Sequence, residues 1–202
     1  MGHRIHLLRH APLLNVAGIA YGREAEINRT PRQDFRTLAQ NLPAGAVWMT
    51  SDYPRTLATA EELIKEGAPQ PAQWPPLVCP AFTEQSWGNW IGRRHSEIAG
   101  SDPSYTTIFR QQPGWADTAP PLGENFNQLV ARVGQGLETL VQEVAPGEVV
   151  IVSHGGTLRA ALVHVGWGDA NQVIKTPARY LSHLSLTHNR QRPAQWAVEK
   201  LP

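Results

Sequence analysis

Cysteine, net charge and long apolar runs are all scarce in this sequence, and each shortage excludes a class of protein. Cys79 is the only cysteine, which excludes an intrachain disulfide and a cysteine-rich zinc site. The formal net charge is +1, so no strong field would hold nucleic acid or an anionic membrane. No apolar stretch approaches the roughly 20 residues that a transmembrane helix needs. We therefore expect neither nucleic acid nor a membrane among the partners.

The first apolar run does not resemble a secretory signal, because it is short and is interrupted by His6 and Arg9. We therefore expect a cytoplasmic protein. Its 202 residues, 41% of them hydrophobic, suit a single folded domain over residues 1–202. The 17 glycines and 17 prolines predict many loops between its secondary-structure elements.

Short apolar runs alternate with segments of helical periodicity along most of the chain. The runs predict strands at residues 4–8, 46–51, 77–79 and 148–152, and near 181–187 and 195–200. The periodic segments predict helices that begin with Thr30 as the N-cap, near Pro54, near Phe126 and at Thr157. In the second of these, Leu57, Ala60 and Ile64 are expected to face the core. The alternation predicts an α/β fold whose sheet is covered on both faces.

Residues 80–122 are the least regular part of the chain. Short helices are expected near residues 93–99 and 104–111. A long irregular stretch within a compact domain is more often a lid or a binding loop than a plain connection. Trp87, Trp90 and Trp115 are therefore candidates to line the mouth of a pocket.

Three of the expected strands are followed by arginine or histidine. Arg9 and His10 end the first strand, Arg55 lies in the first turn after the second, and His154 follows residues 148–152. Functional groups in α/β sheets gather beyond the carboxyl ends of the strands. Arginine matches phosphate oxygens bidentately, and helix N-termini favour anions. Neighbouring arginines also disfavour a protonated imidazole, so His10 is a candidate nucleophile at a phosphate site.

Two other sites are compatible with some of these residues. His10 and His154 could ligate zinc, although the adjacent arginines would repel the cation and no carboxylate pair has a fitting spacing. Ser51 or Ser153 could serve a Ser/His/Asp hydrolase, but neither lies in a Gly-x-Ser-x-Gly turn.

Five motifs in order resemble the histidine phosphatase superfamily, which includes the cofactor-dependent phosphoglycerate mutases. They are Leu-Leu-Arg-His-Ala at 7–11, Ser-Asp-Tyr-Pro-Arg-Thr-Leu-Ala-Thr-Ala at 51–60, Glu-Gln-Ser-Trp-Gly-Asn-Trp-Ile-Gly at 84–92, Gly-Glu-Asn at 123–125 and Ser-His-Gly-Gly at 153–156. The resemblance extends from residue 4 to about residue 165. Chain length, Tyr-Gly-Arg at 21–23 and the tryptophan-rich motif are most similar to the α-ribazole phosphatase-like members.

The resemblance implies a fold, a reaction and a role for each matched residue. The fold would be a three-layer α/β/α sandwich with a mostly parallel sheet, here with a lid-like insertion at about residues 80–122. His10 would become a phosphohistidine during hydrolysis of a small phosphate monoester. Arg9, Arg55 and His154 would bind the phosphoryl group, and Glu84 would act as acid and then as base. The family needs no metal, and we expect no cofactor for this protein.

The chain departs from the family pattern at a few positions. Ala11 replaces a glycine, Ile91 stands where many members have a second glutamate, Asn125 replaces a serine, and Val16 replaces an asparagine of the mutases. A phosphoglycerate-type phosphomutase and a non-catalytic phospholigand-binding module therefore stay as alternatives. The oligomeric state is also open, with a homodimer among the alternatives.

Several polar residues near the motifs are expected to be structural. Asp52 is interpreted as a helix cap and Glu124 as a hydrogen-bond acceptor. A structural or solvent-facing position is expected for four further histidines: His95, His164, His183 and His188.

Overall fold

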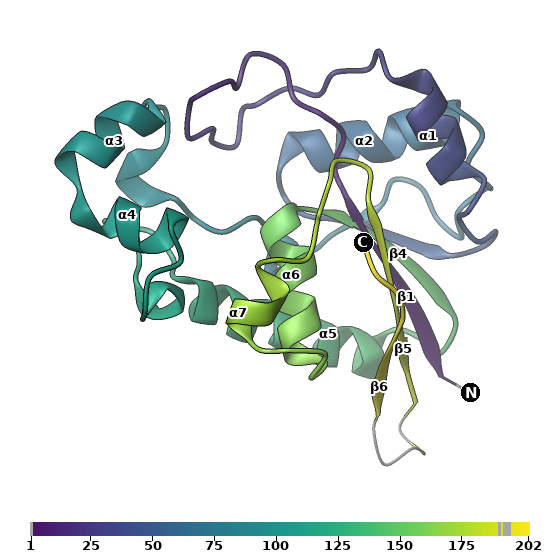
Figure 1. The fold of residues 1–202 in the computed structure, drawn as a ribbon. Helices are drawn as coiled ribbons and strands as arrows, with labels where there is room; N and C mark the ends of the chain where they lie inside the picture. Colours follow the sequence, from purple (N-terminus) through teal and green to yellow (C-terminus); the bar gives the residue numbers. More distant parts are fainter. Residues whose placement is uncertain (1, 190, 192–194) are drawn as a thin grey trace.

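The computed structural model describes residues 2–189, 191 and 195–202, which form a three-layer α/β/α sandwich (Figure 1). Its mixed sheet has six strands in the order β3-β2-β4-β1-β5-β6. Neighbouring strands among β1 to β4 are parallel, whereas β5 is antiparallel to β1 and β6 is antiparallel to β5. The strands are β1 (His3–Arg9), β2 (Val47–Thr50), β3 (Leu77–Val78), β4 (Glu148–Ser153), β5 (His183–His188) and β6 (Trp196–Lys200). The predicted α/β fold and all six strand locations are confirmed.

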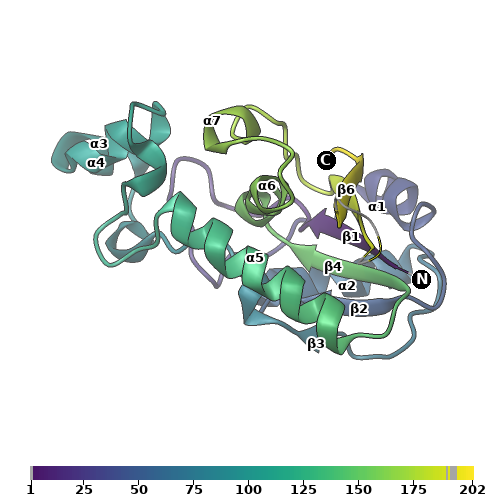
Figure 2. The ribbon, with the colours of Figure 1, turned by 90° about the horizontal axis from the view of Figure 1, so that it is seen from below.

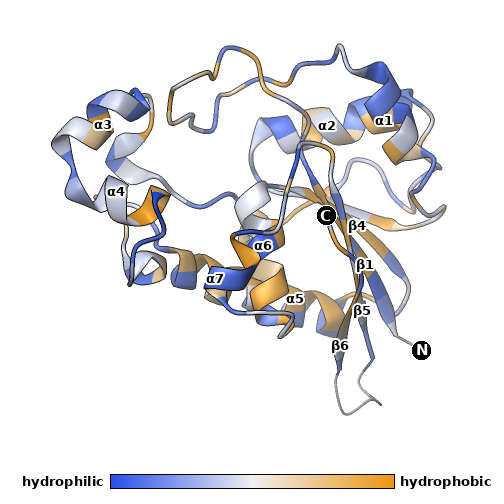
Figure 3. Cartoon of the chain, in the orientation of Figure 1, coloured by the Kyte–Doolittle hydropathy of each residue, from blue (hydrophilic) through white to orange (hydrophobic). Residues whose placement is uncertain are grey.

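Helices cover both faces of the sheet because successive strand residues alternate between two cores. Leu8 and Val150 face the helices α1 (Arg32–Ala39) and α2 (Pro54–Lys65). On the other face, Ile5, Leu7, Val149 and Ile151 pack against the helices α5 (Phe126–Glu143), α6 (Gly155–His164) and α7 (Ala170–Val173). Figure 2 shows α5 lying along the sheet, and Figure 3 shows polar and apolar residues mixed along α1 and α5, as in helices with one buried face.

The first helix begins later than the sequence predicted. Pro31 is the N-cap of α1, and no side chain caps the helix. The backbone N–H and the hydroxyl of Thr30 both donate to Oδ1 of Asn28, at 2.9 and 2.7 Å. The prediction of Thr30 as N-cap is therefore wrong, because the nearby carboxamide engages the group that would have capped the helix.

The inner face of α2 also differs from the prediction at its first turn. Leu57 is 38% exposed, whereas Thr56 and Thr59 are buried. The Thr59 hydroxyl accepts a hydrogen bond from the backbone N–H of Ala11 at 3.0 Å, and the Thr56 hydroxyl lies 3.1 Å from that of Ser51. The start of α2 therefore faces the polar edge of the sheet and not the apolar core. This explains why threonine side chains are buried there while Leu57 is partly exposed.

Residues 80–122 form a small structured unit beside the sandwich (Figure 1). It contains α3 (His95–Ser101), α4 (Pro103–Phe109) and the short 3₁₀ helices η1 (Pro80–Phe82), η2 (Gly88–Trp90) and η3 (Trp115–Asp117). Trp90 is buried with Ala20, Ile98 and Ile108, and its indole N–H donates to Asp102 at 3.0 Å. The two predicted helices are confirmed within a few residues. Among the described residues, no helix is long and apolar enough to cross a membrane.

Candidate active site

His10 lies at the carboxyl edge of β1 with its side chain fully buried. Its Nδ1 is 2.8 Å from the carbonyl oxygen of Ala11. A carbonyl can only accept, so Nδ1 carries the proton of the neutral ring and Nε2 keeps its lone pair. Nε2 is buried and has no hydrogen-bond partner among the described residues. Burial first, and then the charge of Arg55, hold the pKa of His10 well below its usual value, so the ring stays neutral at pH 7.

Arg9 follows the last buried positions of the same strand and is held from two sides. One terminal nitrogen donates to the carbonyl of Ala178 at 2.6 Å, and the guanidinium carbon lies 3.9 Å from the centroid of the Tyr180 ring. Nε of Arg9 is buried without a partner among the described residues. Arg9 is therefore fixed by the chain between α7 and β5 and still has a donor available for an anion.

Arg55 occupies the first turn of α2 and is almost completely buried. It donates to the carbonyl of Gly22 at 2.8 Å, and its guanidinium carbon lies 4.6 Å from the Tyr53 ring centroid and 5.4 Å from that of Tyr21. Its Nε has no partner among the described residues. Burial, followed by the carboxylate of Glu84, raises the pKa of Tyr21 to about 12, so this neighbour is a neutral phenol.

His154 is the N-cap of α6, and its ring centroid lies 5.2 Å from that of His10. Its Nε2 is hydrogen-bonded to the hydroxyl of Ser51 at 2.8 Å, while Nδ1 is buried without a partner in the described chain. Burial lowers the pKa of His154 well below its usual value, and the proximity of His10, which disfavours a second charged imidazole, and the charge of Arg55 lower it further. The ring is therefore held by Ser51 at one nitrogen and offers the other to a ligand.

The pair of Ser51 and His154 raises the serine-hydrolase alternative again, but the third member of a triad is missing. In a triad, a carboxylate binds the histidine nitrogen that faces away from the serine. Here that nitrogen, Nδ1, has no partner in the described chain, and Ser51 is itself buried. Nor do three or more His, Cys, Asp or Glu side chains of the described residues gather as a metal site.

Glu84 follows η1 and lies against the first turn of α6. Its Oε1 accepts from the backbone N–H of Gln85 at 3.0 Å. A Cβ added to Gly156 would collide with the same oxygen, so a residue with a side chain at 156 would displace the carboxylate. The absence of a side chain at Gly156 thus brings Glu84 to the helix N-terminus where Gly155 and His154 lie.

Arg132 on α5 holds the segment that carries Glu84. Its guanidinium binds Glu124 bidentately, at 2.9 and 2.7 Å. Its remaining terminal nitrogen donates to the carbonyls of Ala81 and Thr83, at 2.9 and 3.1 Å. Glu124 is therefore a structural acceptor, as predicted, and it acts through this arginine.

Asp52 does not cap α2, so that prediction is wrong. The N-cap of α2 is Tyr53, without a side-chain cap bond. Asp52 instead pairs with Arg23 at 2.5 Å and accepts a hydrogen bond from the hydroxyl of Thr83. These bonds lower the pKa of Asp52 and link the loop after β1 to the segment before Glu84.

A cavity of about 310 Å³ opens beside Arg9 and Glu84. Its other lining side chains are aromatic or apolar, with a few polar groups among them: Ile19, Tyr21, Gln85, Trp87, His95, Ile108, Phe109, Gln111, Trp115, Phe126, Arg159 and Ile174. The expectation that tryptophans line the pocket is confirmed for Trp87 and Trp115. Trp90 instead lies in the buried core of the 80–122 unit.

The structure adds residues to the site that the sequence did not indicate. Arg159 follows Gly155 by four positions on α6, so helical spacing alone could have placed it on the same face. His95 begins α3 and lines the cavity, with Nδ1 buried and unpartnered in the described chain. Tyr180 comes from an irregular loop, and no periodicity or motif pointed to it.

Fold and site together define a phosphoryl-transfer enzyme: a neutral buried imidazole faces two arginines and a second imidazole at the carboxyl edge of a sheet. A family model described as the histidine phosphatase superfamily (branch 1) matches residues 5–201. The chain therefore belongs to the histidine phosphatase superfamily and is a phosphoric monoester hydrolase of its phosphatase branch.

Curated relatives of similar sequence include phosphatases and a mutase, and solved structures share the fold. The chain is 27% identical over 161 residues to an adenosylcobalamin/alpha-ribazole phosphatase of Salmonella typhimurium, covering 77% of this chain and 75% of the relative. It is 31% identical over 145 residues to a 2,3-bisphosphoglycerate-dependent phosphoglycerate mutase of Gloeobacter violaceus, covering 71% of this chain and 64% of the relative. The crystal structure of the alpha-ribazole phosphatase from Shigella flexneri has the same fold, with a TM-score of 0.80, 20% identity and coverage of 98% and 95%.

Proposed function

We propose that this protein hydrolyses a small-molecule phosphate monoester through a phosphohistidine on His10. The observation that supports this most directly is the state of the His10 ring. Its Nδ1 proton is committed to the Ala11 carbonyl, and its buried Nε2 has a lone pair and no partner in the described chain. A nitrogen in that state is a nucleophile that needs no further deprotonation.

In the first step, Nε2 of His10 attacks phosphorus and the bond between phosphorus and the alcohol oxygen breaks. The electron pair of that bond leaves with the oxygen, which takes a proton from the Glu84 carboxyl group. Nε of Arg9 and Nε of Arg55 are donors for the phosphoryl oxygens. Nδ1 of His154 is a third donor when the Ser51 hydroxyl donates to Nε2.

In the second step, water attacks the phosphohistidine and the bond between phosphorus and nitrogen breaks. Glu84, now a carboxylate, takes the proton of the water, and inorganic phosphate leaves. His10 returns to its neutral form with Nε2 free. The fixed positive charges come from arginine side chains, so the scheme is metal-independent and requires no cofactor.

The cavity beside Arg9 and Glu84 is the proposed site for the alcohol part of the substrate. It is bounded by residues of the 80–122 unit, for which we propose a lid-like role within a single domain of residues 1–202. The relative named as an adenosylcobalamin/alpha-ribazole phosphatase supports a small phosphorylated metabolite as the substrate.

The test is release of p-nitrophenol from p-nitrophenyl phosphate in the presence of a metal chelator. We expect turnover by the wild-type protein, loss of turnover in His10→Ala, and an acid-labile phosphoenzyme that His10→Ala does not form. Activity that the chelator abolishes, or a phosphoenzyme that persists in His10→Ala, would contradict the proposal.

A phosphoglycerate-type mutase is the second candidate, because one relative with 31% identity is such a mutase. To distinguish a mutase from a phosphatase, the protein is incubated with 3-phosphoglycerate and 2,3-bisphosphoglycerate, and the formation of 2-phosphoglycerate is measured. Interconversion faster than phosphate release would favour the mutase. Binding of phosphate analogues without turnover of any substrate would favour the non-catalytic phospholigand-binding module.

A further inference from the structure

Arg159 brings a positive charge into the cavity that adjoins the phosphate site. It lies one turn beyond Gly155 on α6, and a Cβ at Gly155 would be 3.4 Å from Nε of Arg9. Residues four apart share a helix face, and a helical side chain leans toward the N-terminus. The guanidinium of Arg159 therefore lines the same cavity as Arg9 and Glu84, which is the proposed site of the leaving alcohol.

This guanidinium is poorly satisfied by the protein itself. Nε of Arg159 donates to the carbonyl of Thr176 at 3.3 Å, and no carboxylate of the described residues forms an ion pair with it. By contrast, Arg23 pairs with Asp52, and Arg132 pairs with Glu124. Burial and then the nearby charge of Arg9 lower the pKa of Arg159, while the carboxylate of Glu84 in the same cavity acts in the opposite direction without forming an ion pair with it.

Much of the remaining cavity wall is aromatic or apolar, with a few polar side chains among them. The rings of Trp87 and Phe109 are stacked with centroids 5.5 Å apart, and those of Trp115 and Phe126 are 5.0 Å apart. Aromatic walls bind rings and other apolar bodies, and they leave orientation to the few polar groups present. Beyond Arg9, the cavity thus combines a largely aromatic wall with a second guanidinium, that of Arg159, which has no ion-pair partner among the described residues.

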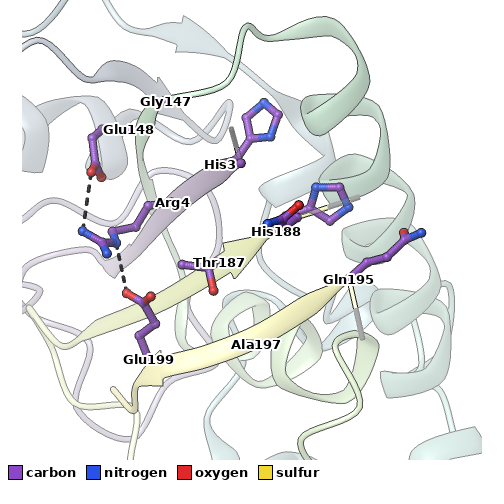
Figure 4. A pocket seen from close by; sticks show the side chains of 11 residues that line it. His3, Arg4, Gly147, Glu148, Thr187, His188, Gln195, Ala197 and Glu199 are labelled. Atoms are coloured by element: carbon purple, nitrogen blue, oxygen red, sulfur yellow. Dashed lines mark ion pairs between the residues drawn. The ribbon is translucent and has the colours of Figure 1, made fainter. Parts of the chain in front are cut away.

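A second cavity provides a contrast within the same molecule. It measures about 340 Å³ and lies at the opposite end of β1, around His3 and Arg4 (Figure 4). Its arginine, Arg4, forms ion pairs with Glu148 at 3.6 Å and with Glu199 at 3.0 Å. The protein therefore neutralises Arg4, whereas no carboxylate of the described residues pairs with Arg159.

We propose that Arg159 binds a second oxyanion on the leaving alcohol of the substrate. The preferred substrates are then phosphate monoesters of ring-bearing alcohols that also carry a carboxylate or a second phosphate group. The inference rests on the proposed phosphatase function and adds a substrate class to it. It also separates Arg159 from Arg9 and Arg55, which serve the transferred phosphate and act on every substrate alike.

The test compares 4-(carboxymethyl)phenyl phosphate with 4-ethylphenyl phosphate, whose leaving phenols have similar acidity and size. For the wild-type protein we expect kcat/KM to be about 10- to 100-fold higher for the carboxymethyl compound, the range of a charge-assisted hydrogen bond. In Arg159→Gln the preference should disappear, with little change for the ethyl compound. Arg159→Lys should restore part of it, because the charge remains.

Two further arms make the comparison specific. Arg110→Gln removes a charge from an exposed position at the rim, next to the lining residues Phe109 and Gln111, and should leave the preference intact. 4-(Phosphonomethyl)phenyl phosphate shows whether a larger dianion is favoured over a carboxylate. A preference for either anionic compound that is lost in Arg159→Gln supports the proposal.

Equal losses with both neutral and anionic substrates in Arg159→Gln would overturn the proposal, since Arg159 would then serve the transferred phosphate or the fold. A lower melting temperature of Arg159→Gln than of the wild-type protein would show that the loss comes from the fold. If the wild-type protein hydrolyses none of the compounds, the phosphatase function fails, and calorimetric binding to His10→Ala still decides the inference. Equal affinity of that variant for the ethyl and carboxymethyl compounds would overturn it, and a preference lost on adding Arg159→Gln would support it.

Discussion

The carboxylate of Glu84 lies where a side chain at Gly156 would have to be. The obstructing atom is the flexible end of Glu84 and not backbone, so a methyl group at 156 can be accommodated by displacing the carboxylate. The position of the proposed general acid therefore depends on the absence of a side chain at the start of α6.

Gly156→Ala should lower kcat/KM by about 10- to 100-fold while costing little stability, because general acid catalysis depends on the position of the donor. The loss should be larger for an alkyl phosphate than for p-nitrophenyl phosphate, since nitrophenolate leaves without a proton. Glu84→Gln should show the same dependence on the leaving group. Gly155→Ala is the matched control, because its Cβ meets Arg9 only at 3.4 Å. Equal losses in the two alanine variants would contradict this role for Gly156.

Ser51→Ala should reduce kcat by about tenfold and leave the phosphohistidine detectable, because the hydroxyl orients His154 by one buried hydrogen bond. A serine nucleophile would instead lose all covalent phosphoenzyme when Ser51 is replaced. Rapid-quench labelling of the phosphoenzyme separates the two cases. Ser153→Ala serves as the control, since its hydroxyl donates to the Leu8 carbonyl and not to His154.

The ring of His10 should remain neutral at pH 6, with its proton on Nδ1. Its pKa is held low by burial and then by the Arg55 charge, so protonation begins only at more acidic pH. Arg55→Gln removes that charge and should raise the pKa of His10 toward its usual value. Nitrogen-15 NMR of the imidazole reports both the tautomer and the titration. A wild-type ring that is already imidazolium at pH 6, or protonated on Nε2, would refute the assignment.

Acid should destabilise the protein partly through His183. This ring is hydrogen-bonded to Nδ1 of His6 at 2.8 Å, and burial lowers the pKa of His183 from 6.5 to about 3. Above pH 6.5 both the folded and unfolded states are neutral at this residue. Below it the unfolded state binds the proton first, so stability falls by about 1.4 kcal/mol per pH unit.

His183→Gln should therefore lose less unfolding free energy than the wild-type protein between pH 6 and pH 5, by about 1 kcal/mol. Urea unfolding at the two pH values measures the difference. His10 and His154 respond to acid in the same direction but are present in both proteins, so they cancel in the comparison. Identical pH dependence in the two proteins would show that His183 titrates normally.

The strand ends could be predicted from the sequence because parallel strands deliver their carboxyl ends to one edge of a sheet. That rule is enough to bring Arg9, His10, Arg55 and His154 together. The role of Glu84 was predicted only from the family resemblance, since its loop has no periodic pattern. Tyr180 lies far along the chain from Arg9 and reaches it through tertiary folding that no local pattern encodes.

Two predictions about helices were wrong because residues outside the helix decided the outcome. Thr30 has the composition of an N-cap, but Asn28 engages its hydroxyl first. Leu57 fits a helical apolar stripe, yet the first turn of α2 faces polar groups of the site. In both cases a sequence rule for helices was overridden by an interaction with residues outside the helix.

Arg132 ties Glu124 to the carbonyls just before Glu84, and this has a consequence for how the enzyme can diversify. The segment that carries Glu84 is thereby secured to α5, and His10 lies at the edge of the sheet, whereas α3 and α4 form part of the cavity wall. The wall of the cavity can then be exchanged while the chemistry stays in place. Evolution, or a designer grafting a different segment between Trp87 and Leu122, can change which alcohol is accepted without rebuilding the machinery that breaks its phosphate bond.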